Sequence, residues 1–521
     1  MADTNQARLA DALERANSIA RKGVVRSASL ERRDQELLRE GGYLHDICKG
    51  WYLLSRPTQR ARESTVWYAA FWDFLAVYLQ ERFGSDYCLS ALPSVEVHIG
   101  ANLVPRQVTA ITARGGTSNL ELPHETSLLV YQDAKNLPRE VDEVRDLRVM
   151  PLPVALCRIP VTFFQKRGTD AEIALRSLKS GDDLVRVILE AKSASLAGRF
   201  AGAYKFLGDE EWAQQIVKAA EAARIACHPE NPFAQVAPVL DGTTRLVSPY
   251  AGRIEAMFRT MRQPGLDVFK DFKRPAFPGV GAYLQHVDDV YEHDAYNSLS
   301  IEGYQVTPEL IERIRLGLWN PEADLADQEQ VAAMAAKGYL EAFRLVKKSV
   351  RSVLEGQSAA VVAKSEYQDW YRALFSPSVQ AGLLEAYQLA GHRNGRVFIR
   401  ASRHVPPPSD AVTDAMTALF ERLKNEPEAV VRGVLGHFLF GFIHPYFDGN
   451  GRMARFLMNV MFASGQYPWT IIRNVQRKQY LDALEAASTQ QDIVPFARFI
   501  REEMSVDWSK SIPPVKTGNG V

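Results

Sequence analysis

Four side chains with distinct chemistry lie close together between residues 444 and 455: His444, Asp448, Arg452 and Arg455. A histidine whose pKa is about 6.5 is largely neutral near pH 7 and accepts a proton from a hydroxyl group. Aspartate is a hard oxygen ligand suited to Mg²⁺, and arginine presents a planar fork of N–H donors to phosphate oxygens. The stretch therefore predicts a site where a histidine base acts beside a phosphorylated substrate.

A loop between two helices is expected to position these side chains. Residues 445–451 include Asp-Gly-Asn-Gly, and these residue types favour turns over helix interiors. Apolar residues recur every three or four positions in 431–442 and in 453–461, which predicts a helix on each side. The N–H groups of the loop then lie at the positive N-terminus of the second helix, where phosphate binds.

Each of these residues also has a plainer interpretation. Arg452 and Arg455 share one helix face beside the loop, where a nearby anion would compensate for the helix dipole, but two solvated arginines are the alternative. Asp448 taken alone fits a loop-capping turn. His437 lies among apolar residues of the first helix and is expected to be a core or supporting group. His444 differs because it stands at the helix-to-loop junction, before a proline that ends the helix.

The same stretch resembles the signature of the Fic family, HPFxDGNGRxxR. Eight positions match: His444, Pro445, Asp448, Gly449, Asn450, Gly451, Arg452 and Arg455. The resemblance implies an all-α catalytic domain that transfers AMP from ATP to a Ser, Thr or Tyr hydroxyl of a target protein, with Mg²⁺ as the metal ion. Two departures are Tyr446, where the family usually has Phe, and Gly441, where relatives often carry Glu.

The family resemblance assigns a role to each matching residue. His444 is expected to deprotonate the target hydroxyl, and Asp448 to hold Mg²⁺ against the nucleotide phosphates. The anion hole is assigned to Gly449, Asn450 and Gly451, and the terminal phosphates to Arg452 and Arg455. Downstream, residues 477–484 resemble the segment that lines the adenine pocket, which makes Tyr480 a candidate there, although a core tyrosine is nearly as good an interpretation.

A second motif lies upstream, at residues 297–303. Ser298, Glu302 and Gly303 match the inhibitory pattern of the family, [ST]xxxE[GN], and the position before the catalytic stretch resembles the subclass with a built-in inhibitory helix. A glutamate that reaches Arg455 would form a charge-assisted pair where a terminal phosphate should bind. A helix that merely ends in glycine is the alternative interpretation.

Residues 396–405, followed by three prolines, resemble the family's flap, a β-hairpin near the active site. Alternating apolar residues favour an edge strand, and the prolines exclude a helix. The resemblance implies that a target protein docks on this edge by strand addition. An ordinary surface hairpin is equally consistent with the segment.

Composition limits the class of protein without naming its function. The chain has 521 residues, 46% of them hydrophobic, and 62 basic against 62 acidic residues, which indicates a globular multidomain protein that is not a general polyanion binder. The polar start and the lack of a long apolar run predict a cytoplasmic protein with no membrane span. Its four cysteines are far apart and without a CxxC pair, so neither a zinc site nor a disulfide framework is indicated.

Changes in pattern along the chain predict several domains. An N-terminal α/β module should occupy 1–230, with a winged helix at 20–60, and a turn-rich linker 231–274. The Fic domain is expected at 275–507, including the inhibitory helix 297–303 and a core at 362–507, before a flexible tail at 508–521. Long helical patterns dominate the Fic region, whereas 95–99, 108–112 and 128–130 are predicted strands of the N-terminal module.

The N-terminal module also resembles, loosely, the winged-helix antitoxins of bacterial abortive-infection systems. Residues 21–62 contain ten Lys or Arg against five Asp or Glu, and a helical pattern there is followed by a glycine turn and an aromatic-rich strand. This local excess predicts contact with a DNA backbone, with a solvated helix face as the alternative. The residues proposed for that contact are Arg32, Arg33, Arg39, Lys49 and Arg56.

Two other functions remain open from the sequence. One is a DNA-binding regulator that uses the Fic fold only as a nucleotide sensor. The other is an enzyme that removes AMP from modified proteins, with Glu302 aligning the attacking water. The target, the nucleotide donor, the direction of the reaction and the oligomeric state are not determined by the sequence.

Overall fold

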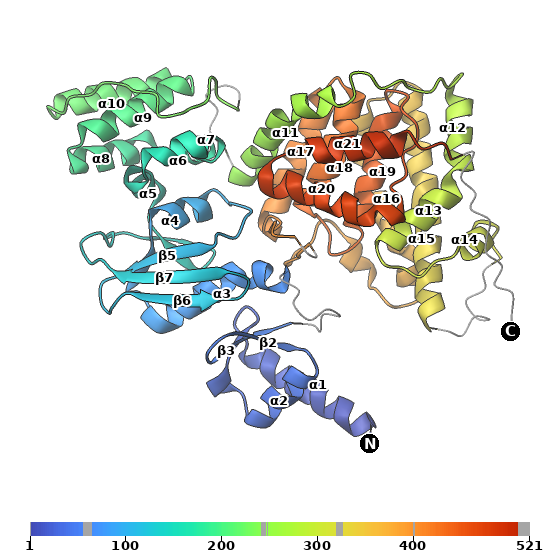
Figure 1. Cartoon of the computed structure of the whole chain (residues 1–521), viewed down its shortest axis with the longest axis horizontal. Coiled ribbons are helices and arrows are strands. Elements are labelled where there is room, and N and C mark those ends of the chain that lie inside the picture. Colours follow the sequence, from blue (N-terminus) through green and yellow to red (C-terminus); the bar gives the residue numbers. More distant parts are fainter. Residues whose placement is uncertain are drawn as a thin grey trace. The chain divides into compact units, whose positions relative to one another are not determined.

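The structure, a computed structural model, describes residues 2–55, 65–240, 246, 248–318, 327–399 and 402–508. The chain divides into two compact units, which can be followed by colour in Figure 1. The N-terminal unit comprises Met1–Arg253 with Val397–Pro407, and the C-terminal unit comprises Ile254–Arg396 with Pro408–Val521. The fold class expected from the sequence is confirmed, since the first unit is mixed α/β and the second is helical.

The division falls inside the predicted linker 231–274, which also contains helix α11 (Pro249–Asp267). Of the predicted tail 508–521, all but Trp508 lies outside the described residues, and so does Arg56 of the proposed DNA contact.

The N-terminal unit begins with a small three-stranded sheet. Its elements are, in order, α1 (Ala2–Ile19), β1 (Val24–Arg26), a 3₁₀ turn (Ser27–Ser29), α2 (Arg32–Glu40), β2 (Leu44–Cys48) and β3 (Trp51–Leu54). The strands are antiparallel in the order β1-β3-β2, so the β2–β3 pair forms a ribbon. Arg15 donates two hydrogen bonds of 2.8 Å to the Asp34 carboxylate, which ties α1 to α2 over a core that includes Leu38.

A four-stranded mixed sheet follows, after helix α3 (Thr65–Phe83). Its strands β4 (Tyr87–Leu89), β5 (Gln107–Thr112), β6 (Ser118–Leu122) and β7 (Thr126–Gln132) lie in the order β4-β5-β7-β6, with β5 and β7 parallel. The predicted strands at 108–112 and 128–130 are confirmed. The strand predicted at 95–99 is wrong, because residues 95–98 belong to helix α4 (Ala91–His98) and Ile99 is its C-cap residue; residues 93–97 are all buried.

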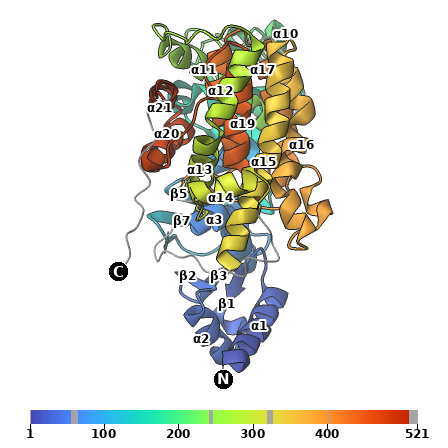
Figure 2. The same cartoon turned by 90° about the vertical axis from the view of Figure 1, so that its right-hand side faces the viewer.

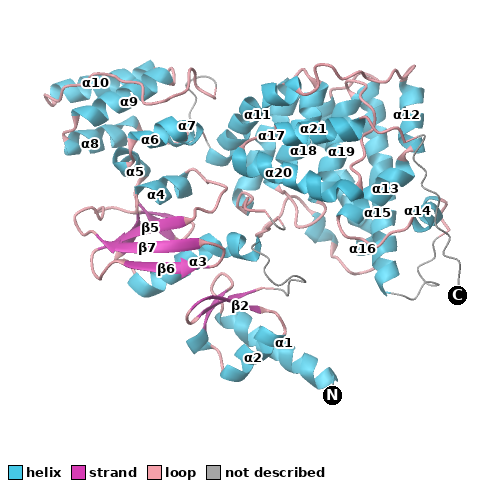
Figure 3. Ribbon diagram, in the orientation of Figure 1, coloured by secondary structure: helices cyan, strands magenta, loops and turns pink. Residues whose placement is uncertain are grey.

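Two short strands and six helices complete the N-terminal unit. All strands among the described residues belong to this unit (Figure 3). The remaining elements are β8 (Asp142–Val144), β9 (Leu147–Val149), α5 (Leu152–Arg158), α6 (Val161–Lys166), α7 (Gly168–Arg176), α8 (Gly181–Ala191), α9 (Ala194–Phe206) and α10 (Glu210–Ala222).

The C-terminal unit is built from helices. After α11 come α12 (Val280–Asp289), α13 (Tyr291–Ile301), α14 (Pro308–Arg315), α15 (Asp327–Leu354), α16 (Ala359–Gln380), α17 (Val412–Asn425), α18 (Ala429–Ile443), α19 (Asn450–Ala463), α20 (Arg477–Gln490) and α21 (Val494–Met504). Short 3₁₀ turns lie at Ala386–Leu389, Ser409–Ala411 and Asn474–Gln476.

Two helix pairs form the centre of this unit. The long helices α15 and α16 pack side by side, as Figure 2 shows, and α18 packs on α19. Helix α18 is buried along almost its whole length, with only Arg432 and Gly441 outside the core. The α18–α19 pair therefore offers a rigid base for the loop between its two helices.

Within the described part of the chain, no helix is both long and apolar enough to cross a membrane.

Candidate active site

The predicted helix-loop-helix is present, and its loop is shorter than expected. Helix α18 ends at Ile443 and α19 begins at Asn450, so the last two residues of the predicted loop 445–451 form the first turn of α19. Gly449 stands at the N-cap with a φ of +80°, a left-handed conformation that glycine adopts without steric cost. The N–H groups at the start of α19 have no acceptor within the helix, and such groups are suited to binding an anion.

His444 adopts a strained backbone conformation at the end of α18. Its φ is +53°, in the left-handed region that histidine seldom occupies, so neighbouring groups must hold it. Arg393 holds this backbone in place. Its Nε donates to the His444 carbonyl at 2.8 Å, and its backbone N–H donates to the Pro445 carbonyl at 2.9 Å. Arg393 is buried and was not predicted as a site residue.

The imidazole of His444 is arranged to act as a base. Its Nδ1 lies 3.3 Å from the carbonyl oxygen of Gly441. A carbonyl oxygen only accepts, so Nδ1 carries the proton in this contact and Nε2 keeps its lone pair. Burial lowers the pKa of His444 to about 4, which keeps the ring neutral near pH 7. Gly441 stands at the position where the family resemblance leads us to expect Glu, and a Cβ atom there would meet no other atom within 4 Å.

The side-chain amide of Asn450 stabilises the loop through hydrogen bonds to the loop backbone. Its Oδ1 accepts from the Tyr446 backbone N–H at 2.9 Å, and its Nδ2 donates to the Tyr446 carbonyl at 2.8 Å. The side chain is 2% exposed, so these bonds satisfy most of a buried amide. Its predicted part in an anion hole stays a prediction, with one amide hydrogen left for that purpose.

The two arginines of the motif are buried, which excludes the interpretation of a solvated pair. Arg452 is 1% exposed and Arg455 is 2% exposed. Arg455 donates from Nε to Ser298 Oγ at 2.9 Å and from Nη2 to the Ser298 carbonyl at 3.1 Å. The same Nη2 donates to Glu302 Oε1 at 2.6 Å. The structure thus brings the predicted inhibitory motif and the predicted catalytic motif together.

Glu302 lies directly against the start of α19. A Cβ atom on Gly451 would approach Glu302 Oε1 to 2.3 Å, so only glycine leaves room for the carboxylate. Burial opposes ionisation of Glu302, but the charges of Arg455 and Arg452 outweigh burial and lower its pKa. Glu302 is therefore a carboxylate near pH 7 and lies against the N-terminal turn of α19, where the sequence predicts phosphate binding.

The end of α13 explains the glycine of the inhibitory motif. Gly303 has a φ of +94° and ends the helix, with Glu302 as the C-cap residue. The Tyr304 N–H then donates to the Leu299 carbonyl at 3.1 Å, which closes the helix end. Among ordinary residues, only glycine and asparagine adopt this left-handed turn readily, and these are the two that the motif allows.

Asp294 supports α13 from one turn before Ser298. It is 3% exposed and accepts a hydrogen bond of 2.7 Å from the Tyr339 hydroxyl on α15. Burial raises the pKa of Asp294 to about 6, although the bond from Tyr339 opposes this rise. A buried carboxyl group with a partner on α15 fixes the rotation of α13, and with it the direction of Ser298 and Glu302.

Two buried N–H donors of the site have no hydrogen-bond partner: Arg452 Nε and Arg455 Nη1. Unpaired buried donors are costly, and an anion such as a phosphate would satisfy both. Asp448 is the metal-ligand candidate of the loop, with a side chain that is 60% exposed. One exposed carboxylate beside a phosphate site suits Mg²⁺, which takes most of its other ligands from water and substrate.

Asp448 also makes the local contacts of the plainer interpretation. Its Oδ1 accepts from the Gly449 N–H at 2.6 Å, and its Oδ2 accepts from Arg452 Nη2 at 3.1 Å. The described residues contain no cluster of three or more His, Cys, Asp or Glu suited to a metal ion. Any Mg²⁺ held by Asp448 would therefore depend on the nucleotide for further ligands.

Tyr480 lies in the core beside Arg455. Its side chain is 3% exposed, and its hydroxyl lies 2.8 Å from Nε2 of the buried His437. The ring packs at a tilt against Phe496 and Phe499 of α21. This position agrees with a core tyrosine, the alternative that the sequence left open, and a contact with adenine stays a prediction. His437 is buried as expected.

The predicted flap, residues 396–405, is not a regular hairpin in its described part. Residues 400 and 401 lie outside the described residues, and 396–399 form no strand. His404 makes a single antiparallel bridge with Leu103, and the Val405 N–H donates to the Asn102 carbonyl at 2.8 Å. Because the following prolines have no N–H to donate, they cannot extend this pairing into a ladder.

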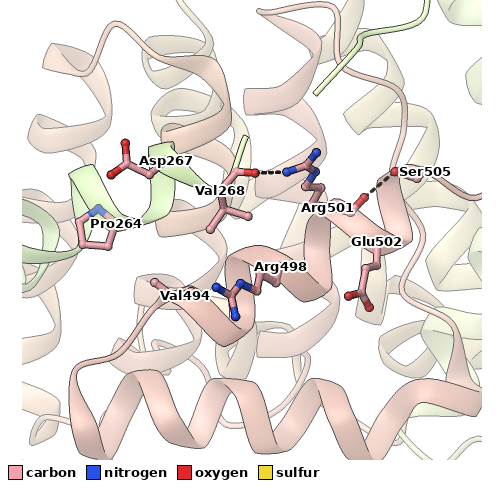
Figure 4. Close-up of a pocket in the computed structure, with 8 residues that line it drawn as sticks. All are labelled: Pro264, Asp267, Val268, Val494, Arg498, Arg501, Glu502 and Ser505. Carbon is pink, nitrogen blue, oxygen red and sulfur yellow. Dashed lines mark hydrogen bonds between the residues drawn. The ribbon is translucent and has the colours of Figure 1, made fainter. Parts of the chain in front are cut away.

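A pocket elsewhere in the C-terminal unit contains none of the motif residues. Figure 4 shows it between α11 and α21, lined by Pro264, Asp267, Val268, Val494, Arg498, Arg501, Glu502 and Ser505. Arg501 Nη1 donates to the Val268 carbonyl at 2.6 Å, and Ser505 Oγ donates to the Arg501 carbonyl at 2.8 Å. Acidic and basic groups are mixed on its wall, which favours no one ligand charge.

Comparison with known proteins agrees with this geometry. Residues 362–462 match the model of the Fic/DOC family. The chain carries a Fic domain. This domain includes His444 to Arg455, whereas Ser298, Glu302 and Gly303 lie before the matched residues and Tyr480 lies after them. The Glu302–Arg455 contact therefore joins the Fic domain to a preceding helix of the same unit.

Several curated relatives of the Fic domain carry the name protein adenylyltransferase Fic. One from Nematostella vectensis is 29% identical over 224 residues, which span 42% of this chain and 46% of the relative. One from Drosophila yakuba is 37% identical over 133 residues, 23% of this chain and 26% of the relative. The chain thus matches less than half the length of these relatives.

The chain also matches solved structures of Fic proteins, with low TM-scores and low sequence identity. Fic-1 (residues 134–508) from C. elegans is 16% identical, with a TM-score of 0.36, over 65% of this chain and 94% of that one. A Fic domain containing signaling protein from Bacteroides thetaiotaomicron is 18% identical, with a TM-score of 0.33, over 48% of this chain and 93% of that one.

Proposed function

We propose that this protein transfers AMP from ATP to a Ser, Thr or Tyr hydroxyl of a target protein, and that Glu302 holds it in an inhibited state. The observation that carries the proposal is the position of the Glu302 carboxylate, bonded to Arg455 and seated against Gly451. A carboxylate thus already lies against the N-terminal turn of α19 and a buried guanidinium group, where the phosphates of a nucleotide would fit. The names of the curated relatives support the reaction type.

The proposed step is an attack of the target hydroxyl on the α-phosphorus of ATP. The hydroxyl proton passes to Nε2 of His444 as the new O–P bond forms, and the P–O bond to pyrophosphate breaks. Arg452 and Arg455 stabilise the negative charge of the phosphates with N–H donors that are already in place. A Mg²⁺ ion held by Asp448 would add further charge neutralisation when bound.

Glu302 inhibits this step in two ways. Its carboxylate occupies Nη2 of Arg455, which would otherwise bind a terminal phosphate, and its negative charge repels the phosphates. ATP can then bind only with its phosphates displaced from the reactive pose. Removal of the carboxylate would free Arg455 without altering His444, so the catalytic groups would remain intact.

Labelling with two forms of ATP tests the proposal. The full chain and its Glu302→Gly variant are incubated with a cell lysate and with ATP labelled at either the α- or the γ-phosphate. AMP transfer predicts protein label from the α-form alone, and no label in the Glu302→Gly/His444→Ala double variant. Protein label from the γ-form, or none from either form, would contradict the proposal. UTP and GTP labelled at the α-phosphate identify another donor if ATP is not the preferred one.

Removal of AMP is the alternative reaction for the same site. In that reaction Glu302 aligns a water molecule on the AMP–protein bond, so loss of the carboxylate would lower the rate instead of raising it. A target labelled with AMP by the Glu302→Gly variant and then given to the wild-type chain distinguishes the two directions. The target itself is proposed to dock on the flap, residues 396–405.

We also propose that the first sixty residues contact duplex DNA. The order of elements from α1 to β3, with α2 before a two-stranded ribbon, supports a winged helix. Arg32 and Arg33 are exposed on α2, and Arg39 lies at its end. Two of these arginines have acidic neighbours, since Arg32 pairs with Glu36 and Arg39 with Asp46. Arg33 is therefore the residue from which the largest effect on DNA binding is expected.

A further inference from the structure

The guanidinium group of Arg452 packs against two aromatic rings. Its central carbon is 5.2 Å from the centroid of the Tyr304 ring and 5.1 Å from that of Phe375. Phe375 comes from α16, and Tyr304 follows the inhibitory motif directly. Neither aromatic residue belongs to the sequence motifs of the site.

The two rings hold Arg452 and leave N–H donors available. Cation–π attraction holds a guanidinium group over the face of an aromatic ring, whereas hydrogen bonds to an anion leave from its N–H groups. Arg452 Nη2 donates to Asp448, and Nε has no partner. The two rings therefore hold Arg452 in position while an N–H donor stays free for a phosphate.

The same segment occupies N–H donors of a second arginine, Arg455. Its edge is engaged by Ser298 and Glu302 through three hydrogen bonds. Glu302 and Tyr304 are separated only by Gly303, whose left-handed turn returns Tyr304 toward the helix end. Within this one segment, Glu302 thus occupies an N–H donor of Arg455, while the ring of Tyr304 packs against Arg452.

We propose that Tyr304 is a positioning residue that presents Arg452 to the phosphates of the nucleotide. The inference rests on the proposed function and adds a second role to the inhibitory segment, which becomes part of the nucleotide site as well as its inhibitor. Relief of inhibition then requires the Glu302 side chain to leave Arg455 while Tyr304 stays in place. Displacement of the whole segment would free Arg455 and weaken ATP binding together.

The test measures the affinity of Mg-ATP for the full chain with Glu302→Gly and His444→Ala, a parent in which neither inhibition nor turnover interferes. Tyr304→Leu keeps apolar volume but lacks a π face, and should raise the Kd about two- to thirtyfold. Tyr304→Phe keeps the ring and loses only the hydroxyl that interacts with Arg452, so it should raise the Kd less than Tyr304→Leu does. Tyr296→Leu, at an exposed tyrosine of α13, is the matched control and should have no effect.

A double-variant cycle separates positioning from a general loss of structure. If Tyr304 acts through Arg452, then Tyr304→Leu should cause no further loss of affinity once Arg452→Ala is present. An equal loss with and without Arg452 would overturn the inference, as would unchanged affinity in Tyr304→Leu. A parent that binds no nucleotide at all would instead overturn the proposed function, and the inference with it. In the active Glu302→Gly chain, Tyr304→Leu should raise the KM for ATP more than it lowers kcat.

Discussion

Arg455 and Glu302 form a buried ion pair across 153 positions of sequence, with Nη2 and Oε1 2.6 Å apart. Burial disfavours the charge of each group, and the partner's charge more than offsets this, so the pKa of Glu302 is lowered and that of Arg455 is raised. Both groups therefore stay charged over the range in which the enzyme would work. A nucleotide phosphate is the natural competitor for this arginine, because it offers the same kind of acceptor.

The role of His444 as base leads to a loss-of-function prediction. In a Glu302→Gly chain, His444→Ala should lower AMP transfer by about 10²-fold or more, because the hydroxyl proton then has no positioned acceptor. Folding and Mg-ATP binding should be unchanged, and circular dichroism with calorimetry measures both. His392→Ala gives a control at another histidine of the same unit. Transfer at the parental rate in His444→Ala would exclude this residue as the base.

The lowered pKa of His444 predicts an unusual pH profile. The ring accepts a proton only in its neutral form, which is present above its pKa and lost as the pH falls through it. Since burial lowers this pKa to about 4, the single-turnover rate of the Glu302→Gly chain should stay level down to about pH 5 and then fall by half near pH 4. A midpoint near the ordinary histidine value, about 6.5, would mean that the base is more solvated than its position indicates.

The backbone of Gly303 predicts a graded effect on inhibition. At a φ of +94°, a residue with a side chain strains the closed turn, by about 1–2 kcal/mol for most L-residues and by less for asparagine. At saturating ATP, Gly303→Ala should therefore label targets faster than the wild type, and Gly303→Asn should stay close to it. Since a Cβ at this position meets no atom within 4 Å, backbone strain is the only cause expected. Equal rates for the three chains would show that the turn does not hold Glu302.

The proposed DNA contact predicts a salt-dependent affinity. The full chain should shift duplex DNA at low salt, with an affinity that falls steeply as salt rises because bound counterions are released. Arg33→Glu should weaken binding to all sequences and lower the salt slope by about one, while Arg186→Glu on α8 should not. No shift with micromolar protein at low salt would leave α2 and the ribbon as a protein-interaction surface.

The loop and the helices of the catalytic motif could be predicted because the signals are local. Glycines mark the turn, and apolar spacing marks α18 and α19, so only the start of α19 was misplaced. The Glu302–Arg455 contact followed from family resemblance, since no local spacing connects residues so far apart. By contrast, Val95, Val97 and Ile99 alternate with Glu96 and His98, which is the period of a strand, although α4 spans this stretch and residues 93–97 are all buried.

Arg393, Phe375 and Tyr304 could not have been found from spacing. Each acts through a partner more than 50 positions away, with Arg393 on the carbonyl of His444 and the two rings on Arg452. Their residue types are also ordinary for a turn or an apolar helix. Tyr304 carries the one usable signal, because a residue that follows a helix-ending glycine is turned back toward the helix.

The central claim, that a carboxylate of this chain inhibits its own transfer site, is tested most directly by a mutation that should increase activity. The initial rate of labelling with α-labelled ATP is measured for wild type, Glu302→Gly, Arg455→Ala and the double variant. Release of a charge-assisted bond of about 1.5–3 kcal/mol should raise the rate about ten- to hundredfold in Glu302→Gly. Arg455→Ala should abolish transfer in both backgrounds. A rate in Glu302→Gly that is unchanged or lower than that of the wild type would contradict the claim and leave Ser298 to Gly303 as no more than the end of a helix.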